Sequence, residues 1–100
     1  MPDLPELNPV IHGKLRLALL SLLTGLEEAE FTWLRNKTGS TDGNLGAQLA
    51  RLEEAGYVRV KKKFVNRKPR TLYRVTDAGR QALTEYVRAL KQLLGKAIDA

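Results

Sequence analysis

The chain has 100 residues, and its 17 lysines and arginines against 11 acidic residues give a formal net charge of +6. This length suits one compact domain, and a 43% hydrophobic share excludes a disordered chain. With no cysteine and one histidine, the chain lacks residues for disulfides, thiol chemistry or a multi-histidine metal site, so we expect no metal and no cofactor. The longest apolar run, residues 15–23, contains Arg16 and is too short to cross a membrane. The lack of cysteine is compatible with a reducing cytoplasm, where we expect the protein.

The positive charge is concentrated in one segment of the chain. Eight basic residues and no acidic residue lie between Arg59 and Arg74, whereas the remainder holds nine bases and 11 acids. A concentrated cationic segment produces a field that attracts polyanions, whereas a diffuse excess serves mainly solubility. A solvated basic loop is the alternative for such a segment taken alone.

The first part of the chain predicts an extended arm followed by a long apolar helix. Residues 1–8 include two prolines and form the predicted arm. Asn8 and Pro9 are suitable residue types for a helix N-cap and first position, and apolar residues follow at helical spacing until Gly25. This helix is apolar on most sides, which favours a partner subunit as its cover.

The middle of the chain predicts two short helices joined by a tight turn. A short strand at 30–32 leads into a helix over 33–38, and Gly39 with Ser40 forms the turn. The next helix spans about 41–55, and three of its residues recur at helical spacing on its inner face: Leu45, Leu49 and Leu52. Gly56 then suits the left-handed position after a helix.

From residue 57 the apolar period changes from helical spacing to two, which predicts a β-hairpin. Its strands cover residues 57–64 and 71–76, and the tip over 65–70 contains the turn formers Asn66 and Pro69. Thr76 or Asp77 caps a last helix. Its apolar positions are spaced by four, three and four residues, as in a coiled-coil seam: Leu83, Val87, Leu90 and Leu94.

The order of these elements is helix, short strand, helix, turn, helix, basic hairpin and helix. Two short helices joined by a glycine-containing turn are typical of a helix-turn-helix, and an appended cationic hairpin makes its winged version. We therefore expect a mainly α, α+β fold with a small β-hairpin, in which residues 9–99 form one DNA-binding domain. No arrangement of catalytic nucleophile and base, phosphate loop or metal cluster indicates an enzyme.

Four segments resemble the small single-domain winged-helix transcriptional regulators of the MarR/ArsR-like kind: 31–35 (Phe-Thr-Trp-Leu-Arg), 41–45 (Thr-Asp-Gly-Asn-Leu), 52–58 (Leu-Glu-Glu-Ala-Gly-Tyr-Val) and 73–80 (Tyr-Arg-Val-Thr-Asp-Ala-Gly-Arg). The resemblance covers about residues 9–94. It implies a homodimeric regulator of double-stranded DNA, acting as a repressor, with the third helix as reader and the hairpin as wing. The chain lacks the cysteine-rich metal sensor of many ArsR-type proteins and has no room for the long dimerisation helices of full-length MarR-type proteins.

The third helix carries the candidate base-reading residues. Asn44 and Gln48 are one turn apart, and their amides can form paired hydrogen bonds with adenine in the major groove, although ordinary surface polarity explains either residue alone equally well. Ser40, Thr41 and Arg51 are candidates for the DNA backbone; capping by Thr41 and an ion pair of Arg51 with Glu54 are the alternatives.

Two glycines lie inside the same predicted helix, where each costs about 1 kcal/mol relative to alanine. Gly43 and Gly46 are therefore interpreted as sites of close approach, by the DNA backbone or by the first helix. Simple sequence drift is the remaining explanation.

The hairpin carries the candidate wing contacts. Its residues for the phosphate backbone or the minor groove are Lys61, Lys63, Asn66, Arg67, Lys68 and Arg70. The predicted subunit interface combines the first and last helices through Ile11, Leu15, Leu19, Leu83, Val87, Leu90 and Leu94. Two other functions stay open from the sequence: a winged-helix scaffold for protein assembly and a non-specific, nucleoid-type DNA binder.

Overall fold

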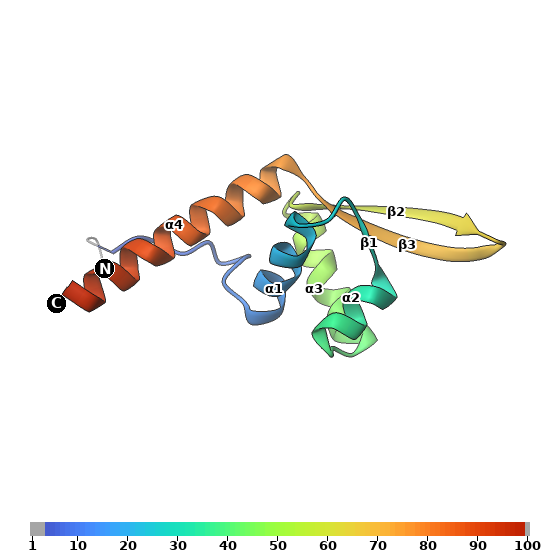
Figure 1. Cartoon of the computed structure of the whole chain (residues 1–100), viewed down its shortest axis with the longest axis horizontal. Helices are drawn as coiled ribbons and strands as arrows, with labels where there is room; N and C mark the ends of the chain where they lie inside the picture. Colours follow the sequence, from blue (N-terminus) through green and yellow to red (C-terminus); the bar gives the residue numbers. More distant parts are fainter. Residues whose placement is uncertain (1–3, 100) are drawn as a thin grey trace.

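The structure is a computed structural model that describes residues 4–99 of the chain. Its helices and strands follow in the order α1 (Lys14–Thr24), β1 (Ala29–Glu30), α2 (Phe31–Thr38), α3 (Asp42–Glu54), β2 (Val58–Val65), β3 (Lys68–Val75) and α4 (Asp77–Asp99) (Figure 1). The order confirms the predicted α+β winged fold.

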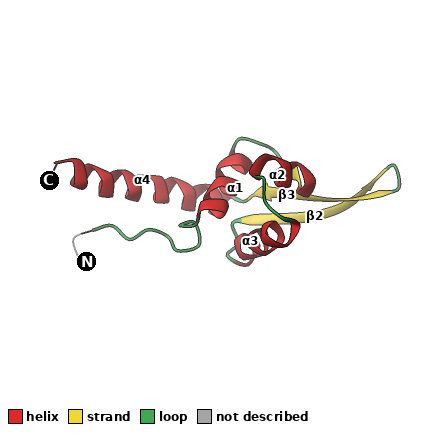
Figure 2. Ribbon diagram, turned by 90° about the horizontal axis from the view of Figure 1, so that it is seen from below, coloured by secondary structure: helices red, strands yellow, loops and turns green. Residues whose placement is uncertain are grey.

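The sheet and the last helix extend from opposite sides of a compact cluster of α1, α2 and α3. The strands are antiparallel and lie in the order β1-β3-β2. Figure 2 shows the β2–β3 hairpin projecting beyond the helices at one end, while α4 leads away at the other. This arrangement makes the chain elongated, with extents of 58 × 25 × 21 Å. None of the helices over residues 4–99 is long and apolar enough to cross a membrane.

The core lies where the three short helices meet the base of the sheet. Its fully buried side chains are Ile11, Leu19, Leu20, Leu23, Leu34, Leu45, Leu49, Leu52 and Val58. The predicted inner face of α3 is therefore confirmed. Tyr73 of β3 closes the core. Its burial raises the pKa of its phenol, and the nearby Glu53 carboxylate raises this pKa further.

The first helix begins later than predicted. Asn8 accepts hydrogen bonds from the amides of Val10 and Ile11 through Oδ1, but this capped turn ends at Gly13, whose extended backbone starts α1 only at Lys14. The interruption has a side-chain cause, because the Arg16 guanidinium donates to the carbonyls of Pro9 and Val10 and fills the space beside Gly13. The first turn is thus held by an arginine rather than continued into the helix.

The second helix begins earlier than predicted. The strand expected over residues 30–32 is Ala29–Glu30, and Phe31 is already the first residue of α2. Glu30 pairs with Leu72 at the edge of the sheet, and the strand ends there because α2 begins at the next residue. The predicted turn is confirmed, since Gly39 has the left-handed φ of 66° that a helix end favours.

The hairpin is longer and its turn tighter than predicted. The second strand begins at Lys68 rather than residue 71, and Pro69 lies within it, opposite Phe64. The turn consists of Asn66 and Arg67 alone, both with positive φ, which is the pattern of a two-residue hairpin turn. A wing of this kind holds its tip residues in a fixed geometry.

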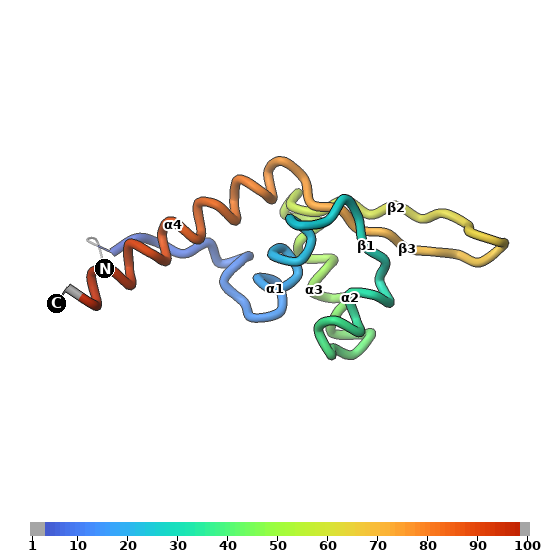
Figure 3. Tube along the Cα trace, viewed as in Figure 1, coloured from blue at the N-terminus to red at the C-terminus, as the bar shows by residue number. Residues whose placement is uncertain are grey.

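Helix α4 starts at a capped end and continues well past the core. Thr76 Oγ1 accepts the Gly79 amide at 3.0 Å, which confirms one of the two predicted caps. Ala82 and Tyr86 are buried, whereas Ile98 is 80% exposed. Figure 3 shows the segment before α1 running back beside α4, and His12 Nδ1 lies 2.9 Å from the Tyr86 hydroxyl. Residues 1–3 of the predicted arm lie outside the described residues.

Candidate nucleic-acid interface

The N-terminal half of α3 presents the predicted base-reading residues. Thr41 is the N-cap, and its Oγ1 accepts the Asn44 amide at 3.2 Å. Because Leu45 and Leu49 anchor the helix inward, Asn44 is exposed and Gln48 is half-buried at the side facing α1. The helix is therefore anchored in the core by its leucines and presents the polar side chains of Asn44 and Gln48 at the surface.

The two amides belong to one hydrogen-bonded chain. Arg16 Nη1 donates to Gln48 Oε1, and Gln48 Nε2 donates to Asn44 Oδ1 at 3.2 Å. Helical spacing predicted that the two amides lie one turn apart, but neither their hydrogen bond nor the contribution of Arg16 was predicted. Its only sequence signal is a lone cation in the otherwise apolar run of α1.

Two of the predicted backbone contacts, Ser40 and Thr41, lie at the start of α3, whereas Arg51 lies in its last turn. Ser40 is half-buried and lies 2.7 Å from the Thr38 hydroxyl, while the Thr41 hydroxyl serves as the cap. Arg51 is exposed, and no ion pair joins it to Glu54 within the described part of the chain. At the start of α3, an ion pair links Arg35 of α2 to Asp42 at 3.0 Å and joins the two helices.

The glycines of α3 face open space. A methyl group added at Gly43 or Gly46 would have no atom of the protein within 4 Å, apart from adjacent backbone. The interpretation that the first helix packs closely against them is therefore wrong. Close approach by DNA stays a prediction.

The strands of the wing place all of their cations except Lys62 on one face. In an antiparallel pair, residues opposite each other share a face, and Arg59 lies opposite Arg74 while Lys63 lies opposite Arg70. Lys61 and Lys68 fall on this same face by alternation, whereas the other face supplies Val58, Tyr73 and Val75 to the core. Strand alternation predicted the basic face of β2, but the pairing with β3 needed the register.

Two acidic residues partly balance this face near its middle. Arg70 Nη1 lies 3.4 Å from Glu30 Oε2, and Lys63 Nζ lies 3.9 Å from Glu28 Oε1. Arg59, Lys61 and Lys68 have no acidic partner among residues 4–99. Like charges directly opposite each other destabilise a sheet, so this wing carries an electrostatic cost that a bound polyanion would relieve.

The wing tip consists of strained, exposed polar residues. Asn66 has a φ of 52° and Arg67 a φ of 66°, a region that arginine seldom adopts. The neighbouring Phe64 is 76% exposed. The predicted tip residues Asn66, Arg67 and Lys68 thus all project where a long ligand could reach them.

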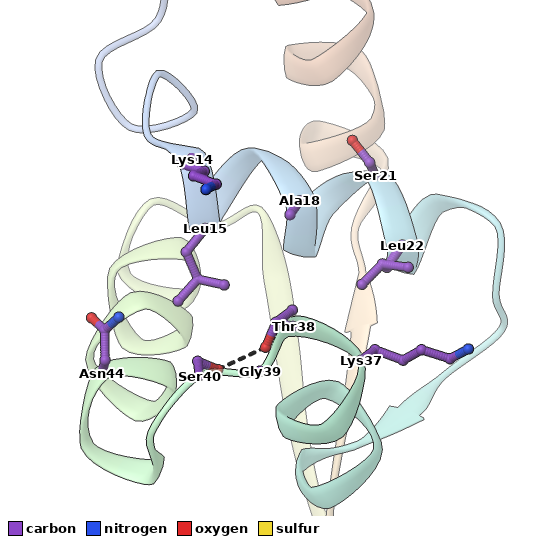
Figure 4. Close-up of a pocket in the computed structure, with 10 residues that line it drawn as sticks. All are labelled: Lys14, Leu15, Ala18, Ser21, Leu22, Lys37, Thr38, Gly39, Ser40 and Asn44. Carbon is purple, nitrogen blue, oxygen red and sulfur yellow. Dashed lines mark hydrogen bonds between the residues drawn. The ribbon is translucent and has the colours of Figure 1, made fainter.

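An open groove of about 850 Å³ lies between α1 and the turn of the motif (Figure 4). Leu15, Ala18 and Leu22 form its apolar floor. Lys14, Lys37 and Asn44 are among the polar residues that line it. Leu15, predicted for the subunit interface, is half-buried here beside α3.

The other predicted interface residues divide into three groups. Ile11 and Leu19 are fully buried in the core of the single chain, so the prediction that they contact a second subunit is wrong. Leu83 and Leu90 are half-buried against the same core, whereas Val87 and Leu94 are exposed.

In the described residues, no group of three His, Cys, Asp or Glu side chains could hold a metal ion.

Helices α2 and α3 are joined by a left-handed glycine turn, α3 presents polar residues outward, and a basic hairpin follows. Together these features define a winged helix-turn-helix protein. The chain belongs to the family of winged helix DNA-binding domains, whose model matches residues 15–94. Membership confirms the prediction of a DNA-binding class that is not enzymatic.

Known proteins of similar sequence and structure agree with this assignment. Uncharacterized protein MJ0432 of Methanocaldococcus jannaschii is 38% identical over 84 residues, covering 84% of this chain and 91% of that protein. The structure of a transcriptional regulator homologue from Pyrococcus horikoshii OT3 matches with a TM-score of 0.82 at 26% identity, over 88% of this chain and 87% of the other.

Two further structures extend the likeness across the fold. A protein of Enterococcus faecalis V583 assigned to the MarR family matches with a TM-score of 0.69 at 26% identity, over 90% and 79% of the two chains. Bacillus subtilis PadR, solved in complex with operator DNA, has the same fold with a TM-score of 0.63 at 20% identity, over 75% and 47%. The resemblance to MarR-like winged-helix proteins is confirmed.

Proposed function

We propose that the protein is a sequence-specific transcriptional regulator of double-stranded DNA that acts as a homodimeric repressor in the cytoplasm, where the DNA is. Helix α3 enters the major groove, with Asn44 and Gln48 at the base edges and Ser40, Thr41 and Arg51 at the phosphates. The wing, from Lys61 and Lys63 to its tip, contacts the adjoining backbone or minor groove. Regulation of transcription is what the similar proteins from Pyrococcus and Enterococcus are described as performing.

The observation that carries the proposal is the like-charge pairing across the wing. Arg59 lies opposite Arg74, neither has an acidic partner within residues 4–99, and this like-charge pair opposes the folding of the hairpin. A protein that needed only solubility would spread these charges over its surface. A surface that concentrates them beside an exposed reading helix gains binding energy from phosphates, which release their counterions on contact.

Selection of bound fragments from random double-stranded DNA tests this function. We expect a palindromic site whose specific affinity exceeds non-specific affinity by a factor of roughly 10³ or more at physiological salt. Weak and sequence-blind binding would instead support a nucleoid-type role. Absence of DNA binding would support the scaffold for protein assembly.

The wing should contribute affinity without contributing base preference. In the double variant Arg67→Ala/Lys68→Ala, we expect weaker binding to every sequence and a shallower dependence of log K on log salt. Each lost phosphate contact should change that slope by about 0.9. Salt titrations on several DNA sequences measure it. The matched control Arg88→Ala/Lys91→Ala removes the same charge from α4, and an equal change in that control would contradict a specific wing contact.

The substitution Gly43→Ala should have opposite effects on the stability of the protein and on its affinity for DNA. Because an added methyl group meets nothing in the protein, Gly43→Ala should stabilise the free protein by up to about 1 kcal/mol. The same methyl should collide with a closely approaching DNA backbone and weaken binding by about 1 kcal/mol or more. Thermal unfolding and DNA titration together check the expectation. Unchanged DNA affinity would show that nothing approaches this part of α3.

The homodimer rests on the exposed apolar seam of α4. Val87 is 39% and Leu94 is 50% exposed, and Ile98, which the sequence interpretation did not include, continues the same stripe. Leu83 and Leu90 complete the seam from its half-buried side. A two-fold pairing through this seam would place two α3 helices about 34–36 Å apart, one turn of DNA, on a palindromic site.

A further inference from the structure

We propose that Arg16 is a specificity-determining positioning residue, which orients the Gln48 and Asn44 amides so that both present N–H donors to the DNA and select guanine. The inference rests on the proposed function, because it assigns the chemistry of the base that α3 reads. It also replaces the adenine pairing expected from residue types alone. Arg16 lies on α1, outside the helix-turn-helix pair.

The direction of the hydrogen-bonded chain is determined by its first member. A guanidinium has donors and no acceptor, so the atom of Gln48 that faces Arg16 is its oxygen, Oε1. The Gln48 nitrogen then lies on the other side and donates to Asn44 Oδ1 at 3.2 Å. Asn44 Nδ2 is left as the outer end of the chain. Reversing either amide would place two donors or two acceptors against each other.

Arg16 is itself held in place from the other side. Its Nε donates to the Val10 carbonyl, and its Nη2 donates to the Pro9 carbonyl at 3.4 Å. A methyl group at Gly13 would lie 2.8 Å from Nη2, so the glycine provides the space for the guanidinium. No carboxylate pairs with Arg16 over residues 4–99. The chain of contacts therefore starts from a fixed donor.

The exposed donors match one base edge better than the others. Guanine presents two acceptors in the major groove, N7 and O6, whereas adenine presents one acceptor and one donor. Cytosine presents a donor and would face the Asn44 N–H groups without a partner. Because Asn44 Oδ1 already accepts from Gln48, adenine is read less well than guanine.

The hydrogen-bonded chain can be tested in the free protein. In the side-chain amide region of a ¹⁵N–¹H NMR spectrum, Arg16→Met should shift the NH₂ signals of both Gln48 and Asn44, because each loses its fixed orientation. The control Lys14→Met removes the same charge from an exposed side chain two residues before Arg16, and it should leave both signals in place. An Asn44 signal that is unchanged in Arg16→Met would overturn the proposal.

Base preference provides the second test. The position read by Asn44 is identified as the one at which Asn44→Ala loses discrimination in competition among four otherwise identical DNA sites. At that position, we expect the wild-type protein to prefer guanine to adenine by about tenfold. Arg16→Met should reduce this ratio to near one, whereas Lys14→Met should retain it.

Gln48→Glu reverses the direction of the chain without removing its contacts. A glutamate accepts from Arg16 and from Asn44 Nδ2, which turns Asn44 Oδ1 toward the DNA. The preferred base should change to adenine or cytosine, which present donors. If the wild-type protein is sequence-specific but the ratio is the same in all variants, only this inference fails. If the wild-type protein shows no base preference, the proposed function fails with it.

Discussion

Replacement of Gly79 by alanine is expected to lower the free energy of unfolding by about 3 kcal/mol, because the new methyl group has no space. Gly79 lies in the first turn of α4, and an added Cβ would be 2.3 Å from the Tyr57 carbonyl oxygen and 2.9 Å from Val75 Cγ2. The first of these neighbours is backbone, so relief requires the helix or the start of β2 to move. The gain of about 1 kcal/mol from alanine in a helix only partly offsets this cost.

The same contact joins the parts of the molecule that function requires. The Tyr57 carbonyl also accepts the Thr76 amide at 2.9 Å, and Thr76 Oγ1 donates to the Gly56 carbonyl at 2.6 Å. These hydrogen bonds therefore join the end of α3, the base of the wing and the start of α4 at one junction. Displacement of α4 here should weaken DNA binding through the wing as well as lower stability.

Gly95→Ala is the matched control for this prediction. Gly95 lies in the same helix, and an added methyl group there meets no atom within 4 Å. We expect it to stabilise the protein by about 0.5–1 kcal/mol, as in an ordinary helix interior. Denaturant unfolding of both variants measures the contrast. Equal stability of the two variants would show that the junction around Gly79 yields without cost.

The elements that depend on periodic burial could be predicted from the sequence. The leucines of α3, the buried end of the hairpin and the left-handed Gly56 each depend on local spacing or on one residue type, and the structure has them where they were expected. The motif as a whole was predictable for the same reason. Burial patterns and turn residues determine the order of elements.

The differences arise where one side chain overrides a local preference. Helix α1 was predicted from Pro9, but Arg16 donates to the carbonyl groups of the preceding turn, through contacts six and seven residues apart that propensity does not encode. The wing strand was predicted to start after Pro69, yet a proline is tolerated where a strand lacks a partner on one side. Neither effect is visible before the chain is folded.

The candidate site was predictable in its residue types but not in its contacts. Asn44 and Gln48 stand out by helical position, whereas their link to Arg16 requires α1 and α3 to be packed together. Apolar spacing also could not separate core from interface, because Leu19 and Leu94 satisfy the same pattern. Only burial distinguishes them, since Leu19 has no exposed surface and Leu94 is half exposed.

The exposed seam of α4 is the surface on which the proposed dimer depends. Buried Ala82 and Tyr86 recur on one side of the helix, and Val87 and Leu94 recur about a quarter of a turn away from them. Helix α4 therefore contacts its own core along one stripe and offers a second apolar stripe, which Ile98 extends. Packing two copies along this stripe would remove the exposed leucine and isoleucine from water.

Placing a charge at two seam positions should abolish the dimer and most of the DNA affinity with it. In Val87→Asp/Leu94→Asp, we expect a monomeric mass by light scattering and a loss of roughly 10²-fold or more in affinity for a palindromic site, because two half-sites are no longer bound together. Affinity for a single half-site should stay the same. The control Gln81→Asp/Gln92→Asp adds the same charges to the opposite side of α4 and should remain dimeric. A monomeric wild-type protein at micromolar concentration would contradict the dimer directly, since no second reading helix would then be joined to the first.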